Sequence, residues 1–246
     1  MEKPMVQIIA HRGASKYVPE NTLEAFQKAH ELGCQFIECD IALTKDLIPI
    51  LMHDDTLNRT TNGKGRVDEY SSDFIQNLDA GSWMNAQLSH LRIPTFKDAL
   101  SWHASTKGWF NFEIKSVDLD KVEIAVSSIL NVFHQASYTQ HIVFSSFQYE
   151  IMKALNQKES NIDKAYLSSE ANDDVLEKAL ETGCYQLNVS KLWVTEHFIE
   201  KAHQRGLKVG VYTVNDVKDF NRLKSWGVDA VFTDDLKAIK SPMLVD

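Results

Sequence analysis

Charged and polar side chains follow several apolar runs of this 246-residue sequence, at the points where strands would end. The first run ends on His11 and Arg12, and later runs carry Glu38, Asp40 and Glu113. Both α/β barrels and doubly wound sheets place their chemistry at the carboxyl ends of parallel strands. We therefore expect the reacting groups to gather at one edge of a parallel sheet.

Three carboxylates are predicted to lie close together. Strand alternation puts Glu38 and Asp40 on one face of their strand, and Glu113 ends another strand. Buried carboxylates need a cation, because an unpaired charge away from water is costly. Three carboxylate ligands favour a hard ion, Mg²⁺ or Ca²⁺. The alternative is a structural ion network in which they pair with Arg12 and Lys115.

Two cations and two histidines accompany the carboxylates. Lys115 lies two residues after Glu113, hence on the same face, where a lysine can hold a phosphoryl oxygen. Arg12 offers a forked contact to the same kind of group. His11 and His53 each end a strand, and a histidine pair suits general acid and base catalysis at neutral pH. The alternatives are simple salt bridges and ordinary capping or packing histidines.

A hairpin is predicted to bring His53 to the carboxylates. The strand over 35–43 is followed by a turn and a returning strand over 48–52. A two-residue turn would place Glu38 opposite His53, and cross-strand partners share a face. Pro49 agrees with this register, since proline is tolerated on an edge strand.

The first helix is predicted over about 21–32. Asn21 is a favourable N-cap residue, and Glu24, three residues later, completes a pair that resembles a capping box. Gly33 suits the C-terminal stop.

Strands and helices alternate along most of the chain. Eight strands are predicted, over 6–10, 35–43, 109–115, 141–146, 164–168, 184–189, 207–214 and 228–233. A (β/α)8 TIM barrel, which typically has about 250 residues, fits this count. A doubly wound sheet is the alternative, but the glycine-rich phosphate turn usual there is absent from the sequence. The turn-rich stretch of about 54–94 is predicted to be a small insertion that caps the barrel mouth, within a single domain over 1–246.

Composition argues against several classes of function. The net charge of −8 disfavours broad binding to nucleic acid or to anionic membranes. No apolar run of the sequence approaches the roughly 20 residues of a membrane-spanning helix, and the first residues lack the apolar core of a secretion signal. The three cysteines have neither disulfide nor zinc-site spacing. We expect a cytoplasmic protein, and the oligomeric state is left open.

An ordered set of motifs resembles the glycerophosphodiester phosphodiesterase family, in its cytoplasmic bacterial form. The motifs are His11-Arg12-Gly13, 19–22, Glu38-Cys39-Asp40, 53–61, Glu113-Ile114-Lys115, 145–147, 212–215, 227–229 and 233–234. Each motif alone is weak, but the ordered set is highly specific and covers residues 9–235. Tyr212 departs from the tryptophan that many members carry, and it keeps an aromatic wall.

The resemblance implies a barrel with an insertion after the second strand, and hydrolysis of glycerophosphodiesters to sn-glycerol 3-phosphate and an alcohol. The implied roles are metal binding by Glu38, Asp40 and Glu113, acid–base catalysis by His11 and His53, and phosphate binding by Arg12 and Lys115. Phe147 and Tyr212 also end strands and are candidates for the pocket wall, with core packing as the alternative. The expected partner is a small-molecule substrate, with no nucleic acid and no membrane.

Three other functions would use similar residues. A hydrolase of lysolipids, similar to phospholipase D, would use the same site and should show an exposed apolar rim near the barrel mouth. A metal-dependent lyase or aldolase would use the carboxylates but leaves the histidine pair unexplained. A non-catalytic binding module would be expected to have lost one of these groups, and all are present.

Overall fold

A closed barrel of eight parallel strands organises the computed structural model, which describes residues 5–240. β1 pairs with both β2 and β9, and these two pairings close the sheet. The predicted (β/α)8 TIM barrel is confirmed. The strands are β1 (Gln7–His11), β2 (Phe36–Leu43), β3 (Pro49–Leu51), β4 (Trp109–Ile114), β5 (Ile142–Ser146), β6 (Asp163–Ser168), β7 (Gln186–Ser190), β8 (Lys208–Tyr212) and β9 (Ala230–Thr233).

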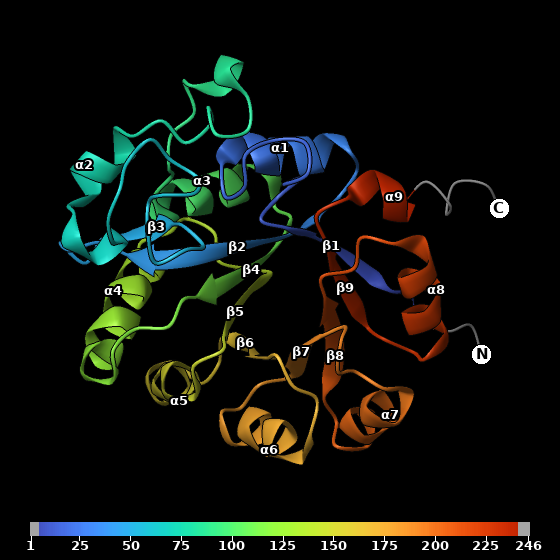
Figure 1. Cartoon of the computed structure of the whole chain (residues 1–246). Coiled ribbons are helices and arrows are strands. Elements are labelled where there is room, and N and C mark those ends of the chain that lie inside the picture. The colour runs from blue at the N-terminus through green and yellow to red at the C-terminus, as the bar shows by residue number, and fades with distance from the viewer. Residues whose placement is uncertain (1–4, 241–246) are drawn as a thin grey trace.

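Helices surround the barrel and connect successive strands (Figure 1). The α-helices are α1 (Leu23–Glu31), α2 (Ser72–Gln76), α3 (Phe96–Thr106), α4 (Val122–His134), α5 (Tyr149–Lys158), α6 (Asp173–Glu181), α7 (Glu196–Gln204), α8 (Val217–Ser225) and α9 (Leu236–Lys240). Short 3-10 helices are η1 (Val67–Glu69), η2 (Ala86–Leu88) and η3 (Leu119–Lys121). Between residues 5 and 240, no helix combines the length and apolar character needed to cross a membrane.

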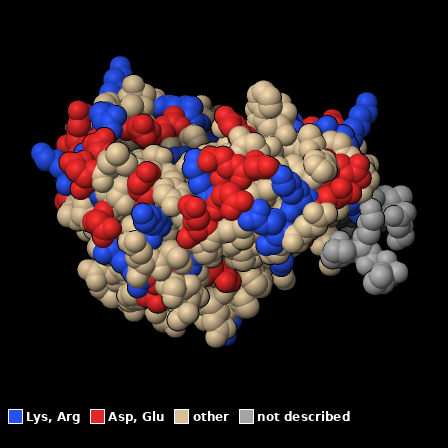
Figure 2. Space-filling view, turned by 90° about the horizontal axis from the view of Figure 1, so that it is seen from below, with Lys and Arg blue, Asp and Glu red and all other residues tan. Residues whose placement is uncertain are grey.

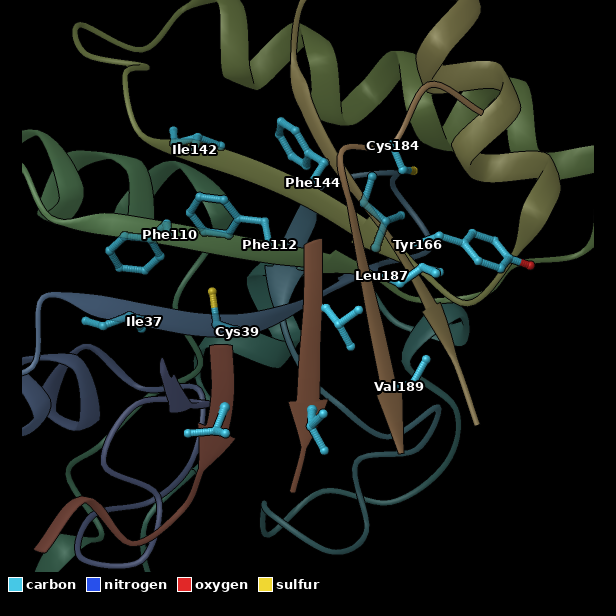
Figure 3. Close-up of a cluster of buried hydrophobic side chains, with 14 of the residues drawn as sticks. Ile37, Cys39, Phe110, Phe112, Ile142, Phe144, Tyr166, Cys184, Leu187 and Val189 are labelled. Atoms are coloured by element: carbon cyan, nitrogen blue, oxygen red, sulfur yellow. The ribbon is translucent and has the colours of Figure 1, made fainter. Parts of the chain in front are cut away.

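Strand alternation separates two apolar regions. One face of each strand packs against the helices, where Cys39, Phe112 and Phe144 join a large cluster of buried side chains (Figure 3). The other face points into the barrel, where Ile9 and Phe232 belong to a much smaller cluster. The large apolar core therefore lies outside the barrel, and polar groups can occupy the interior. Glu38 and Asp40 lie on the interior face of β2 because they alternate with Cys39, which faces the helices.

Helix α1 begins one residue later than its predicted cap implies. Thr22, not Asn21, is the N-cap, and its hydroxyl accepts from the amide of Ala25 at 3.2 Å. The prediction of Asn21 as N-cap is wrong, because Asn21 has a left-handed φ of 58° and turns its side chain to Asp40. Gly33 ends the helix as predicted, with a φ of 73°.

The β2–β3 hairpin pairs one residue out of the predicted register. Leu43 pairs with Pro49 and Ile41 with Leu51, so Glu38 does not oppose His53. The turn is longer than two residues because Leu47 adopts a φ of 61° and the Thr44 hydroxyl accepts from the amide of Ile48. A shift of one residue reverses which face a side chain takes.

The stretch between β3 and α3 lies beside the hairpin, where α2 marks it in Figure 1. It has a small apolar cluster of its own, formed with Ile50 and Met52 around Leu57 and Ile75. The amide of Leu51 donates to the carbonyl oxygen of Pro94 at 2.9 Å, which ties the end of the stretch back to β3.

The surface over α6 and α7 mixes both signs of charge (Figure 2). Lys201 pairs with Asp173 at 2.5 Å, and Arg205 pairs with Glu177 at 2.9 Å, so neighbouring helices are linked by ion pairs. Such exposed pairs contribute only about 0–1 kcal/mol each.

Candidate active site

Glu38, Asp40 and Glu113 converge at the carboxyl end of the barrel. One carboxylate oxygen from each lies within 4.8 Å of the others, and all three residues are buried. The register explains this, since Asp40 on β2 pairs with Glu113 on β4 and Glu38 is two residues earlier on the same face. The structure thus brings together the three predicted ligands.

Asp40 is the most strongly held of the three. Asn21 donates to its Oδ2 at 2.8 Å, and the amide of Asp40 donates to Oδ1 of Asn21 at 3.1 Å. Arg12 Nε lies 3.4 Å from Oδ2, and Lys115 Nζ lies 3.5 Å from Oδ1. Oδ1 nevertheless has no hydrogen-bond partner within the described part of the chain.

Arg12 and Lys115, the two residues predicted to bind phosphate, lie close to the carboxylate triad of Glu38, Asp40 and Glu113. Each already contacts a carboxylate. Lys115 Nζ donates to Glu113 Oε1 at 2.6 Å, and Arg12 Nη1 donates to Glu20 Oε1 at 2.8 Å. The backbone amide of Arg12 also donates to Glu38 Oε2 at 3.0 Å. The structural ion network considered as an alternative, in which the carboxylates pair with Arg12 and Lys115, is therefore present. It contains more carboxylates than cations.

Burial and mutual repulsion change the acidity of the triad. Burial, and then the charge of Asp40, raise the pKa of Glu38 to about 8. The same two causes raise the pKa of Glu113. Burial opposes ionisation of Asp40 as well, but the charges of Lys115 and Arg12 outweigh it and lower the pKa of Asp40. The site holds more negative charge than its own cations neutralise, and a bound cation would relieve that excess.

His11 is fixed by a carboxylate from the far end of the chain. Its Nδ1 lies 2.6 Å from Asp234 Oδ1, which follows β9, and its Nε2 lies 3.9 Å from Glu38 Oε2. Asn215 donates to Oδ2 of Asp234 at 2.7 Å and holds that carboxylate in place. Burial opposes protonation of His11, but the bond to Asp234 and the charge of Glu38 outweigh it and raise the pKa of His11.

His53 is fixed by its neighbour in sequence. Its Nδ1 lies 2.7 Å from Asp54 Oδ1, and Arg59 donates to both oxygens of Asp54, at 2.7 and 2.8 Å. Arg59 also donates to both oxygens of Glu20, which binds Arg12. Burial lowers the pKa of His53. His53 reaches the site although its predicted pairing with Glu38 is wrong, because the chain leaves the sheet after Leu51.

A cavity of about 200 Å³ is lined by most of these groups, but not by Asp40 or Lys115. Its lining includes both histidines, Arg12, Glu38 and Glu113, and also Asn111, Phe147, Leu167, Tyr212, Thr213 and Phe232. Phe147 and Tyr212 meet edge to face at 5.9 Å, and the Tyr212 hydroxyl donates to the carbonyl oxygen of Ser168 at 2.7 Å. Within residues 5–240, the lining takes nothing from 54–94. That stretch approaches the site through Asp54, which binds His53, and through Arg59.

Sequence reasoning missed the residues that orient the predicted ones. Asp54 and Asp234 hold the histidines, and Asn21 holds Asp40. Asp54 is adjacent to His53, and Asp234 directly follows a predicted strand, so both carried a positional signal. Asn21 did not, because its spacing to Glu24 also suits a helix cap.

Comparison with known proteins gives a consistent result. Residues 11–238 match the Glycerophosphoryl diester phosphodiesterase family. A glycerophosphodiester phosphodiesterase of Caldanaerobacter subterraneus subsp. tengcongensis is 31% identical over 230 residues, which cover 93% of each chain. A Bacillus subtilis protein of the same name is 31% identical over 242 residues, covering 92% of this chain and 82% of that one. The structure of an Oleispira antarctica phosphodiesterase, in complex with the product sn-glycerol-3-phosphate, is similar with a TM-score of 0.92 at 29% identity, covering 96% of each chain.

Proposed function

The chain belongs to the glycerophosphoryl diester phosphodiesterase family, and on that premise we propose that it hydrolyses glycerophosphodiesters to sn-glycerol 3-phosphate and an alcohol. The observation that carries the proposal is the convergence of His11, His53, Glu38 and Glu113 on one cavity, with the carboxylate of Asp40 beside the two glutamates. We also propose that residues 1–246 form one domain, with about 54–94 as its insertion. The cytoplasmic location and the absence of nucleic-acid and membrane partners stay predictions.

Glu38, Asp40 and Glu113 would hold the metal, either Mg²⁺ or Ca²⁺. The fit is supported by the all-oxygen donor set, by the unpartnered Oδ1 of Asp40 and by the raised pKa of Glu38. When bound, such a cation supplies neutralisation of the phosphodiester charge.

Arg12 and Lys115 bind and orient the phosphate in this proposal. Both cations face the triad, and each already contacts a carboxylate, Glu20 or Glu113. A guanidinium offers a planar fork to phosphate oxygens and an ammonium offers a compact charge. Fixed cations of this kind stabilise charge that develops in the transition state without reorganisation.

The histidines move protons in this proposal. Asp234 and Asp54 accept from the Nδ1–H of His11 and His53, so each ring presents Nε2 for proton transfer. One Nε2 takes the proton from the oxygen that attacks phosphorus. That oxygen belongs to water, or to the 2-hydroxyl of the substrate in a first step that forms a cyclic phosphate, which water then opens to sn-glycerol 3-phosphate. The other Nε2–H gives its proton to the departing alkoxide as the bond from phosphorus to oxygen breaks.

A panel of substrates tests the proposal. The protein is incubated with glycerophosphocholine, glycerophosphoethanolamine and glycerophosphoglycerol in the presence of Mg²⁺ or Ca²⁺, and release of sn-glycerol 3-phosphate is measured. We expect all three to be cleaved with modest discrimination, because the mouth of the cavity is open at the half-exposed Phe147. Release from none of them would contradict the proposed function.

A lysolipid hydrolase is the second candidate, and an exposed apolar rim favours it. Leu192 and Trp193 follow β7 at the carboxyl end of the barrel and are 77% and 64% exposed. Phe147, which follows β5, is 40% exposed. The small cavity favours deacylated substrates instead, so kcat/KM should be higher for glycerophosphoethanolamine than for lysophosphatidylethanolamine. The opposite order would make the lysolipid hydrolase the better function.

A further inference from the structure

We propose that Asn111 binds a hydroxyl group at the glycerol end of the substrate and so selects glycerophosphodiesters over diesters that lack it. The inference rests on the proposed function and deepens it. It assigns a specificity residue and a direction for the substrate, with the glycerol end inside the barrel and the alcohol end at the mouth.

Asn111 lies on the floor of the catalytic cavity. It is two residues before Glu113 on β4, so both side chains point into the barrel. Across the strand pair it is the register partner of Glu38. It lines the cavity together with these two carboxylates, and it is only 7% exposed.

The amide of Asn111 has no partner for either of its polar atoms. Neither Nδ2 nor Oδ1 makes a hydrogen bond within residues 5–240, although both atoms are buried. Buried amides are normally hydrogen-bonded, because an unpaired one loses its bonds to water without replacement. The side chain therefore has one donor group and one acceptor group available for a ligand.

A hydroxyl group matches this pair of functions. It accepts from Nδ2 and donates to Oδ1, whereas a phosphate oxygen of a diester would only accept. Arg12 and Lys115, the proposed phosphate-binding residues, follow the ends of their strands, so the phosphate binds nearer the mouth than Asn111, which is two residues before Glu113 on β4. A neutral hydroxyl is the group that fits beside the two carboxylates.

The rest of the floor and the mouth fit the same direction. Leu167 and Phe232 are buried and line the same cavity as Asn111, where they can contact the carbon atoms of glycerol. Phe147, at the mouth, is 40% exposed and leaves room for variable alcohol groups. Buried residues at the floor select one end of a ligand, and an open mouth tolerates variation at the other.

The test compares two ligands that differ only in hydroxyl groups. Affinities for sn-glycerol 3-phosphate and for propyl phosphate are measured by calorimetry with Mg²⁺ or Ca²⁺ present. The wild-type protein should prefer sn-glycerol 3-phosphate. In Asn111→Ala, that affinity should fall about 10-fold, the size of a lost hydrogen bond, while propyl phosphate changes by less than about threefold.

Asn188→Ala is the matched control. Asn188 is also fully buried in the barrel with an unpartnered Nδ2, but it is not part of the lining of the catalytic cavity. Its removal should leave the ratio of the two affinities unchanged. Asn111→Leu keeps the branching and the number of heavy atoms of the side chain, and it should reproduce the loss of selectivity if the alanine variant does not fold.

Several results would overturn the inference. One is a wild-type affinity ratio near one, and another is a ratio unchanged in both Asn111 variants. A third is a variant that loses affinity for Mg²⁺ or Ca²⁺ but keeps the ratio, since Asn111 would then serve the cation. Each differs from failure of the proposed function, in which the wild-type protein releases no sn-glycerol 3-phosphate from any diester.

Discussion

The two halves of the barrel contribute different chemistry to the same cavity. The charged half, meaning β1, β2, β4 and the β2–β3 hairpin with the residues that follow them, supplies His11, Arg12, Glu38, His53 and Glu113. The neutral half, meaning β5 to β8 with the residues that follow them, supplies Phe147, Leu167, Tyr212 and Thr213. Asp234 follows β9, which pairs with β1 where the barrel closes.

The charged half is expected to carry out the chemical step, and the neutral half is expected to determine how well the substrate fits. In the charged half, groups of opposite and like charge are buried together, and the pKa of Glu38 is raised to about 8 as a result. Removing one charged side chain from this half changes the electrostatic interactions of all the others. In the neutral half, Phe147 and Tyr212 contact each other and carry no charge, so changes there should alter fit and not the chemical step.

The histidine pair gives the largest expected effect. His11→Ala and His53→Ala should each lower kcat by about 10²–10⁴-fold, the usual contribution of a general acid or base. The double variant should be little worse than either single one, because the groups act in one step. His203→Ala is the control, since His203 binds Asp229 away from the cavity. Fully additive losses in the double variant would argue against a shared step.

The carboxylates that orient the histidines should have an intermediate effect. Asp234→Asn and Asp54→Asn should each lower kcat by about 10–100-fold, because the ring they hold loses its orientation and its fixed proton. Asp229→Asn removes the partner of His203 and should leave kcat unchanged. Equal losses in all three variants, measured as steady-state kcat on folded protein, would show a general structural effect.

The neutral half should give the smallest effect. Phe147→Ala and Tyr212→Phe should change kcat/KM for glycerophosphoethanolamine by less than about 10-fold, since one partly buried apolar contact or one hydrogen bond contributes about 1 kcal/mol. Most of the change should be in KM. Leu192→Ser with Trp193→Ser should leave this substrate unaffected. A fall in kcat as large as that of the histidine variants would remove the distinction between the two halves.

The sequence was sufficient for the barrel and for the groups of the charged half. Strand alternation alone put Glu38 and Asp40 on one face, and the spacing of Glu113 and Lys115 put them together, as the contacts confirm. Periodicity is a local property, and the residues in question lie on regular strands. The resemblance to the family added the ordered motifs that tie these strands to one function.

The sequence was insufficient where the outcome depends on a loop or on barrel closure. The hairpin register depends on Leu47, which adopts a left-handed backbone conformation. Leucine has no preference for that conformation, so the sequence does not predict it. Helix α1 separates Asn21 from Asp40 in the sequence. Whether the Asn21 side chain caps the helix or binds Asp40 is decided by this tertiary contact and not by local sequence. Asp234 meets His11 only because β9 closes on β1, across 223 residues of chain.

The metal dependence of the reaction tests most directly whether Glu38, Asp40 and Glu113 hold a catalytic cation. The rate of sn-glycerol 3-phosphate release from glycerophosphoethanolamine is measured on protein treated with EDTA and then titrated with Mg²⁺ or Ca²⁺. We predict no turnover after EDTA, recovery with one of the two ions, and no recovery in the triple variant Glu38→Ala, Asp40→Ala, Glu113→Ala. Full activity in the presence of chelator, or in the triple variant, would contradict the central claim that these carboxylates hold a catalytic cation.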